Sequence, residues 1–492
     1  MPPTTRWLAQ FTLVLTSVTC IDGTLAQNAD VPPLHGTLLE NPPQKLGSYT
    51  PSDLLSSVTD GYIAQWLLQR TFSPSCSVDV YQLKYETVGG QGEPTTASGA
   101  LMIPTGTDGA CTGPRSIALY AHGKRNLRSF NIADLSGHNY EGLLLALALA
   151  GDGFIVVAPN YAGYDTSTLG YHPFMNADQQ AAEMMDALAA ARVALLSTGT
   201  GDNGKLFVTG YSEGGYVAMA THRALQAAGI PVTASAPMSG PYALSAFSDA
   251  MFLGQVGAGA VEELIMLVTS YQHAYGNLYT NPTDLFEPKY ALADTLLPST
   301  TGTDELVAQG LIPDSAVFSS TPPTPELAAQ TPADSPGIGS DNLVSNAYRL
   351  SYIQDALANP DGGYPDTTTG LPPANPANAL RAALKKNDLR NWAPTAPMLL
   401  CAGDEDPVVF YLNTQLMEGY WAVNAPLSPV TVLDVDAPAS RGGPYKHLKK
   451  EFAETKTLLR WIDGRSAVAQ NYHDVLVPAF CLQAARSFFE GF

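Results

Sequence analysis

The feature that most constrains the fold is a glycine-rich hexapeptide at 210–215, which reads Gly-Tyr-Ser-Glu-Gly-Gly. It follows a short apolar run at 206–209 and precedes a helical pattern at 216–228. A short apolar run bounded by a turn signal is typical of a buried strand, and flanking glycines permit a strained turn. The segment therefore predicts a strand, a tight turn at Ser212 and a helix. A chain with 43 glycines in 492 residues also meets this pattern by chance, so the surrounding sequence must supply the context.

That context is an alternation of strand and helix patterns along the chain. Apolar or alternating runs typical of strands lie at 78–83, 97–103, 117–120, 154–158, 206–209, 397–403 and 430–435. Helical patterns lie at 52–70, 143–150, 178–196, 216–228, 448–462 and 478–489. Such alternation predicts an α/β fold with a mostly parallel central sheet and helices on both faces.

The alternation stops for a long stretch in the second half of the chain. Residues 241–388 are rich in Pro, Thr, Ser and Gly and contain one apolar helical segment at 261–268. We expect this stretch to be an inserted cap or lid, and 261–268 either to line a pocket or to form the core of the cap. The expected organisation is a signal peptide at 1–26, an arm and helix at 27–70, the core at 71–240, the cap at 241–388 and the rest of the core at 389–492.

The N-terminus has the pattern of an export signal. Arg6 precedes a mostly apolar run at 7–21, and small residues before and at Ala26 offer a cleavage site. A membrane anchor is the alternative, but the run is too short to favour it, and no later segment is apolar for long enough to span a bilayer. We therefore expect a secreted, extracellular or periplasmic protein without stable membrane insertion.

Four cysteines remain if the chain is cleaved near Ala26. An even count in an exported protein favours two disulfides, and four cysteines allow three pairings. We favour Cys76–Cys111, which would join two early segments, and Cys401–Cys481, which would join a late strand to the last helix. Buried free thiols are the alternative.

The charge balance excludes one class of partner. The formal net charge is −20, whereas nucleic acids and anionic membranes bind basic patches. We expect no nucleic-acid partner, and nothing in the sequence indicates an obligate protein partner.

A serine hydroxyl needs a base and an orienting carboxylate before it can act as a nucleophile. In α/β-hydrolases these residues follow in the order Ser, acid, His. Only His447 and His473 follow the late strands. His447 lies in a basic segment, where neighbouring ammonium groups favour an exposed surface role. His473 precedes an apolar run that should pack the last helix against the sheet, so we predict His473 as the base.

The acid is expected just beyond the strand at 397–403. The segment there reads Gly-Asp-Glu-Asp-Pro, and we favour Asp406 over Asp404. The alternative is a solvated acidic turn. Asp406 would then orient His473 if the last helix packs beside this strand.

A tetrahedral intermediate needs hydrogen-bond donors for its oxyanion. We expect the backbone N–H of Glu213, the residue after Ser212, to be one donor. The other should come from the loop at 122–124, where we favour the N–H of Lys124 over that of Gly123. His122 is expected to be structural, and the chemistry requires no metal and no cofactor.

These motifs, with 120–123, 158–164, 172–174, 403–409 and Tyr472-His473, resemble the secreted lipase/esterase branch of the α/β-hydrolases from about residue 70 to the end. The resemblance implies the α/β-hydrolase fold and cleavage of small-molecule, lipid or polymer esters through an acyl-enzyme. It also implies that the late Tyr-His pair carries the triad histidine. Two alternatives remain. One is a serine peptidase on small peptides, with Glu262 and Glu263 as an anchor for the free amine, and the other is a catalytically silent binding protein.

Overall fold

The computed structural model describes residues 35–57, 62–136, 139–330, 335–441 and 443–492. Their centre is a nine-stranded sheet in the order β1-β2-β3-β5-β4-β6-β7-β10-β11. Its strands are β1 (Gln44–Tyr49), β2 (Ser77–Val88), β3 (Pro94–Thr105), β4 (Arg115–Ala121), β5 (Ile155–Pro159), β6 (Asp202–Tyr211), β7 (Ala234–Met238), β10 (Met398–Ala402) and β11 (Val430–Asp434). Two short strands, β8 (Phe318–Ser319) and β9 (Ile338–Gly339), pair with each other apart from this sheet.

The sheet is mostly parallel, as the sequence predicts. The six strands from β5 to β11 in the sheet order are parallel to their neighbours. The pairs β1–β2, β2–β3 and β3–β5 are antiparallel. Strand β1 lies in the segment 27–70 that we expected to be an arm and a helix. It joins the sheet because its backbone pairs with β2 at the edge, a non-local contact with no local sequence signal.

Helices cover both faces of the sheet, and further helices lie in the chain between β7 and β10. The α-helices of the described residues are α1 (Pro51–Ser56), α2 (Tyr62–Thr71), α3 (Tyr140–Ala148), α4 (Ala177–Thr198), α5 (Glu213–Ala227), α6 (Leu244–Phe252), α7 (Ala260–Tyr275), α8 (Thr303–Ala308), α9 (Pro325–Gln330), α10 (Asn346–Ala358), α11 (Ala379–Asn387), α12 (Leu412–Asn424), α13 (Lys446–Asn471) and α14 (Val477–Phe489). Side chains alternate along β4: Leu119 packs with α4 and α5, whereas Ala118 and Tyr120 pack with α3 and α14. This arrangement of layers confirms the predicted α/β class.

The helix expected at 52–70 differs from the prediction. Helix α1 ends at Ser56 with Ser57 as its C-cap, and α2 begins at Tyr62. The hydroxyls of Ser56 and Ser57 both donate to the carbonyl oxygen of Asp53. Serine side chains that bond nearby carbonyls compete with the helical hydrogen bonds, which accounts for the early end of α1.

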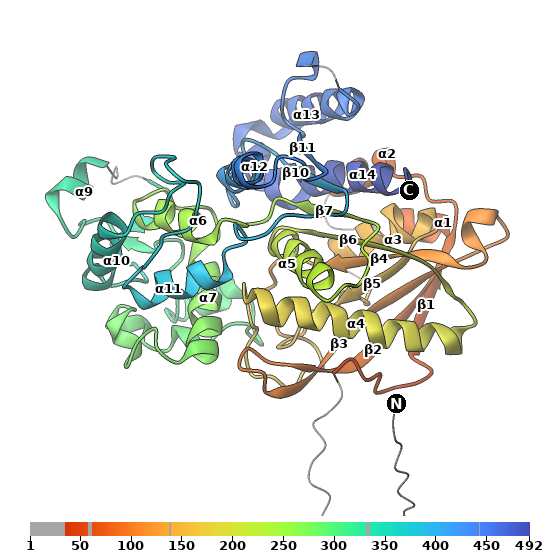
Figure 1. The fold of residues 1–492 in the computed structure, drawn as a ribbon, viewed down its shortest axis with the longest axis horizontal. Coiled ribbons are helices and arrows are strands. Elements are labelled where there is room, and N and C mark those ends of the chain that lie inside the picture. Colours follow the sequence, from red (N-terminus) through yellow and green to blue (C-terminus); the bar gives the residue numbers. More distant parts are fainter. Residues whose placement is uncertain (1–34, 58–61, 137–138, 331–334, 442) are drawn as a thin grey trace, which may run out of the picture. The chain divides into compact units, whose positions relative to one another are not determined.

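The segment between β7 and β10 adds no strand to the nine-stranded sheet in the residues that the structure describes, and we call residues 239–397 the inserted segment. The apolar run at 261–268 is part of α7, as expected. Figure 1 shows α6, α7, α10 and α11 gathered beside one another. The bounds predicted for the cap, 241–388, stay a prediction.

Two buried arginines tie the inserted segment together. Arg381 of α11 pairs with Asp249 of α6 and Asp355 of α10, at 2.8 Å each. Arg390 pairs with Asp361 and Asp388, at 2.6 and 2.9 Å. Each guanidinium therefore meets two carboxylates, which offsets the cost of burying the charges.

The structure contains the two disulfides that we favoured. Cys76 is bonded to Cys111, and Cys401 in β10 is bonded to Cys481 in α14. The second bond joins the strand that precedes Asp406 to the helix that follows His473. The predicted signal peptide at 1–26 lies outside the described residues, and none of the described helices is long and apolar enough to cross a membrane.

Candidate active site

Ser212 lies at a strained turn between β6 and α5. Its φ of 60° and ψ of −122° fall in a region that residues other than glycine rarely adopt. The glycines around it are required by space. A Cβ at Gly210 would overlap the carbonyl of Gly214, and one at Gly214 would overlap the carbonyl of Ala121. The motif therefore brings the turn close to β4 and leaves Ser212 at the carboxyl edge of the sheet.

The structure brings Ser212, His473 and Asp406 into one hydrogen-bonded row. His473 Nε2 lies 2.8 Å from Ser212 Oγ, and His473 Nδ1 lies 2.7 Å from Asp406 Oδ2. Asp406 is 5% exposed, and its other oxygen accepts hydrogen bonds from the N–H groups of Val408 and Val409. A histidine whose Nδ1–H donates to a carboxylate presents Nε2 as an acceptor for the serine proton.

His473 sits in a π-helical turn, Tyr472–Leu476, that leads into α14. The Tyr211 hydroxyl donates to the His473 carbonyl at 2.6 Å, so the residue before Ser212 also holds the backbone of the histidine. Burial alone would lower the pKa of His473, but the charge and hydrogen bond of Asp406, with the charges of Asp474 and Glu263, outweigh it and raise the pKa above its usual value. The imidazole is therefore a stronger base than a free histidine.

The two runner-up residues lie elsewhere. His447 is exposed in the first turn of α13. Asp404 is exposed in the loop after β10, and burial together with the charges of Asp436 and Glu405 raises the pKa of its carboxyl. Neither residue is hydrogen-bonded to Ser212 or His473 among the described contacts.

Lys124 and Glu213, the two residues expected to supply the oxyanion donors, line the same small cavity as Ser212. The N–H of Gly123 donates to Glu141 at 3.1 Å, so that group is engaged. The N–H groups of Lys124 and Glu213 donate to no residue that the structure describes. His122 is fully buried, with its ring nitrogens 2.7 Å from the Gly123 oxygen and 3.1 Å from the Asn160 oxygen, which fits the expected structural role.

Two cavities meet at Ser212. The larger is a cleft of about 540 Å³, and the charged and polar side chains on its wall include Arg125, Asn126, Glu141 and Asp474. The smaller holds about 50 Å³ and is mostly apolar; Leu244, Phe247, Met251 and Phe252 from α6 and Leu264 and Leu267 from α7 line it. Lys124, Ser212 and Glu263 line both cavities, so the serine lies where a large cleft of mixed lining meets a small apolar cavity.

Comparison with known proteins agrees with this arrangement. Residues 144–238 match the prolyl oligopeptidase family. A rice cell wall degrading esterase, LipA from Xanthomonas oryzae, has a TM-score of 0.63 and 26% identity, over 87% of this chain and 98% of that one. The chain is an α/β-hydrolase. A hydrolase candidate from Legionella pneumophila has a TM-score of 0.61 and 20% identity, over 92% and 97% of the two chains, and so supports the fold alone. Curated protein sequences give no match.

The family match does not separate the types of hydrolase. It spans 144–238, from α3 to the end of β7, and so includes the turn at Ser212 but neither Asp406 nor His473. It also ends before the inserted segment that lines the apolar cavity. The match therefore supports the fold and a hydrolase, and leaves ester and amide substrates to be distinguished by the site.

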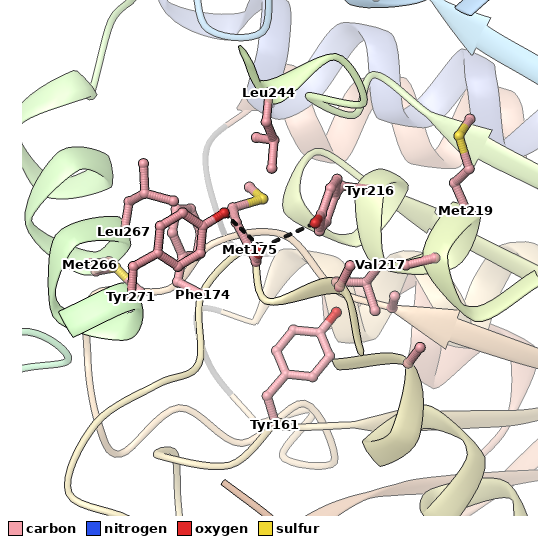
Figure 2. Close-up of a cluster of buried hydrophobic side chains, with 14 of the residues drawn as sticks. Tyr161, Phe174, Met175, Tyr216, Val217, Met219, Leu244, Met266, Leu267 and Tyr271 are labelled. Atoms are coloured by element: carbon pink, nitrogen blue, oxygen red, sulfur yellow. Dashed lines mark hydrogen bonds between the residues drawn. The ribbon is translucent and has the colours of Figure 1, made fainter. Parts of the chain in front are cut away.

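Met175, which lines the apolar cavity, makes a contact that the sequence did not predict. Met175 has a φ of 56°, and its carbonyl oxygen accepts hydrogen bonds from the hydroxyls of Tyr216 and Tyr271, at 3.1 and 3.0 Å. Figure 2 shows these hydroxyls converging on the Met175 carbonyl from α5 and α7. The two bonds hold a strained loop of the hydrolase in place and position Met175 beside the cavity. No local sequence pattern indicates this contact, because it joins three segments that are far apart in the chain: the loop of Met175, α5 and α7.

From the sequence, Glu263 is considered as part of an amine anchor in a peptidase, whereas in the structure it lies beside Lys124. Lys124 Nζ lies 3.7 Å from Glu263 Oε1 and 3.4 Å from the Gly259 oxygen. Burial raises the pKa of Glu263, and the Lys124 ammonium acts against that effect. The carboxylate therefore has a cationic partner from the hydrolase itself, and the pair spans the space between the loop after β4 and α7.

Proposed function

We propose that this hydrolase cleaves carboxylic esters, with Ser212 as the nucleophile, His473 as the general base and Asp406 as the group that orients His473. The observation that carries the proposal is the row of hydrogen bonds from Ser212 Oγ through His473 to Asp406, at 2.8 and 2.7 Å. The likeness to an esterase at 26% identity over most of both chains is further support.

The reaction follows from the direction of these hydrogen bonds. Ser212 Oγ forms a bond to the ester carbonyl carbon while its proton passes to His473 Nε2, and the carbonyl electron pair moves to the oxygen. The N–H groups of Glu213 and Lys124 would stabilise that oxyanion. Collapse breaks the bond to the alcohol oxygen, which takes the proton from His473. Water then attacks the acyl-enzyme by the same route and releases the acid.

The two cavities suggest which side of the ester each one accepts. The small apolar cavity suits the acyl group, because burying its hydrocarbon is favourable. The larger cleft suits the alcohol, because it is the roomier of the two and carries polar and charged groups beside its apolar ones. A second polar groove of about 490 Å³ shares Arg125 and Asn126 with the cleft. A large, hydroxyl-rich alcohol such as a cell wall polymer fits this arrangement, and the Xanthomonas relative is an esterase that degrades rice cell wall.

A serine peptidase is the second candidate, because residues 144–238 match the prolyl oligopeptidase family. Of the two glutamates that the peptidase alternative needs as an amine anchor, Glu262 and Glu263, only Glu263 lines the cavities at Ser212, and its contacts argue against that role. Glu263 already pairs with Lys124 at 3.7 Å, so the ammonium of a peptide would have to displace an internal cation. A catalytically silent fold is disfavoured, because the side chains of Ser212 and His473 are within hydrogen-bond distance.

We also propose that the protein is secreted after cleavage near Ala26. The apolar run at 7–21 supports this, and disulfides such as Cys76–Cys111 and Cys401–Cys481 persist in oxidising compartments. N-terminal sequencing of the mature protein checks the site, and a chain that still carries residues 1–26 contradicts it.

The test is hydrolysis of p-nitrophenyl esters from acetyl to palmitoyl, beside alanine p-nitroanilide. We expect the wild type to cleave esters, Ser212→Ala and His473→Ala to lose about a thousandfold or more in kcat, and His447→Ala to stay within about twofold. Ester hydrolysis that survives Ser212→Ala, or cleavage of the anilide but of no ester, contradicts the proposal.

A further inference from the structure

The side chain of Glu213 points away from the expected oxyanion hole, into the protein. It is 1% exposed, and the His172 side chain is fully buried. One oxygen, Oε1, receives two short contacts: His172 Nε2 and Gln180 Nε2 both lie 2.6 Å away. The other, Oε2, has no hydrogen-bond partner among the described residues. A buried carboxyl group directly after the nucleophile is thus held through a single oxygen.

The protons of this group can be counted. His172 Nδ1 lies 3.0 Å from the Ala162 carbonyl oxygen, which only accepts, so Nδ1 carries a hydrogen. Gln180 Nε2 donates its hydrogen to Oε1. One further proton then lies between His172 Nε2 and Glu213 Oε1, which gives either an imidazolium beside a carboxylate or two neutral groups. The net charge of the pair is zero in both cases, and that is why the pair can be buried.

The pair is joined to three separate parts of the fold. Glu213 is the first residue of α5, His172 lies in the loop that follows β5, and Gln180 is in α4. The His172 ring stacks on Tyr161, with centroids 5.4 Å apart, and contacts the ring of Tyr164 at 4.9 Å. The side chain of Glu213 therefore cannot turn without breaking contacts with segments that are fixed by packing.

We propose that the Glu213 carboxyl group, held by His172 and Gln180, is a positioning group that fixes the backbone N–H of Glu213 toward the oxyanion. It is not a catalytic residue, because its side chain does not face the reacting atoms. The peptide bond between Ser212 and Glu213 lies in a strained turn, and such backbone persists only where its surroundings hold it. This inference rests on the proposed function, since it assigns a role in stabilising the oxyanion.

Glu183 supplies a matched control. It is fully buried in the same helix as Gln180, and burial raises its pKa to about 7. Its hydrogen bonds run to Gln179 at 3.0 Å, to Tyr85 at 3.4 Å and to the backbone of Ala162, and none of them runs to Glu213. Glu183→Gln therefore makes the same chemical change in the same layer without removing a hydrogen bond of Glu213 or Gln180.

The experiment compares Glu213→Gln, Gln180→Met and Glu183→Gln for hydrolysis of p-nitrophenyl butyrate and for inhibition by butylboronic acid. The boronic acid forms a tetrahedral adduct on Ser212 Oγ and so places an oxygen in the oxyanion site. We expect Glu213→Gln to lower kcat by about tenfold or more, since loss of a whole donor costs about a hundredfold. KM should change less than twofold, and the boronate Ki should rise in parallel with the fall in kcat. Gln180→Met should show a smaller change in the same sense.

A purely structural role predicts another pattern. Glu213→Gln would then lower the melting temperature, with kcat per folded molecule and the boronate Ki unchanged, and that result overturns the inference. Should Glu213→Gln fail to fold, Gln180→Met decides, and an unchanged kcat and Ki in it also overturn the inference. Glu183→Gln should stay within about twofold in both quantities, and an equal loss there also contradicts it. A wild type without esterase activity refutes the proposed function instead, so the two failures are distinct.

Discussion

At the residue scale, the turn at Ser212 depends on neighbouring glycines that carry no Cβ atom. Gly214 has the Ala121 carbonyl where its Cβ would be, so the backbone of α5 and that of β4 touch directly. This approach brings the N–H of Glu213 and the loop after β4 to the same point. The glycine is therefore required for packing as well as for the shape of the turn.

Gly214→Ala should for this reason destabilise the protein by about 3 kcal/mol, the upper range for an overpacked core. Gly419, in the middle of α12, is exposed and has nothing within reach of a Cβ. Gly419→Ala should instead raise the stability by up to about 1 kcal/mol through helix propensity. Urea unfolding of both variants measures the difference, and similar free energies of unfolding for the two would contradict this account.

The proposed general base, His473, gives a prediction about how the activity depends on pH. His473 must be neutral to accept the serine proton, and Asp406, Asp474 and Glu263 outweigh burial and raise its pKa. The acid limb of kcat/KM should therefore lie above about pH 6.5, the ordinary histidine value. Asp474→Asn removes one raising charge, so the limb should move to lower pH by some tenths of a unit, and less so in high salt because Asp474 is exposed.

Asp404→Asn is the matched control for that measurement. Asp404 lies two residues before Asp406 and was the alternative acid, yet its carboxylate has no hydrogen bond to His473 among the described contacts. We expect the acid limb and kcat to stay unchanged. A loss of activity in Asp404→Asn comparable with that of Asp406→Asn would move the acid role to Asp404.

At the element scale, α6 and α7 limit the size of the small apolar cavity that we propose for the acyl group. A space of about 50 Å³ holds only a few water molecules. The best substrates should therefore carry short acyl chains, near acetyl to butyryl. Met251 of α6 lines this space. Met251→Ala should shift the best p-nitrophenyl ester toward longer chains, and we expect kcat/KM for the octanoyl ester to rise relative to the acetyl ester.

A control separates added room from lost stability. Met219 of α5 is equally apolar and fully buried, but it does not line the cavity. Met219→Ala should cost about 2–5 kcal/mol of stability, as other buried methionine truncations do, without changing the order of the esters. An unchanged order in Met251→Ala, or the same shift in Met219→Ala, contradicts the assignment of the acyl group to this cavity.

These elements show what the sequence predicts and what it leaves open. The strand and turn around Ser212 are local, so periodicity and glycine spacing indicate them. The position of Asp406 follows because carboxyl ends of parallel strands share one edge. In contrast, Met175 and the pairing of Lys124 with Glu263 arise where distant segments meet. No short pattern encodes such contacts, and the apolar segment of α7 alone could not say which of its side chains face a cavity.

At the scale of the whole molecule, the inserted segment is fastened to the sheet and not merely laid over it. The N–H of Ala177 in α4 donates to the Asn387 side-chain oxygen at 3.0 Å, and the Tyr216 hydroxyl donates to the Asn387 carbonyl at 2.8 Å. The Tyr271 hydroxyl bonds the loop at Met175, and the N–H of Ala258 donates to the Pro407 carbonyl beside Asp406. A large opening of this segment would leave these buried donors and acceptors without partners, at about 1–3 kcal/mol each, and is therefore unfavourable.

Because the inserted segment is held in place in this way, the enzyme should not need an oil–water interface to become active. We expect hydrolysis of tributyrin to rise hyperbolically with concentration and to show no jump where tributyrin passes its solubility limit. Rates measured on both sides of that limit by titration of released acid test this. A sharp increase at saturation would falsify the fixed arrangement, because it requires that α6 and α7 move away from Ser212 at an interface. Asn387→Ala, which leaves the buried N–H of Ala177 without its acceptor, then serves as the comparison. If these hydrogen bonds hold the segment closed, this variant but not the wild type should gain a dependence on the interface, together with a lower melting temperature.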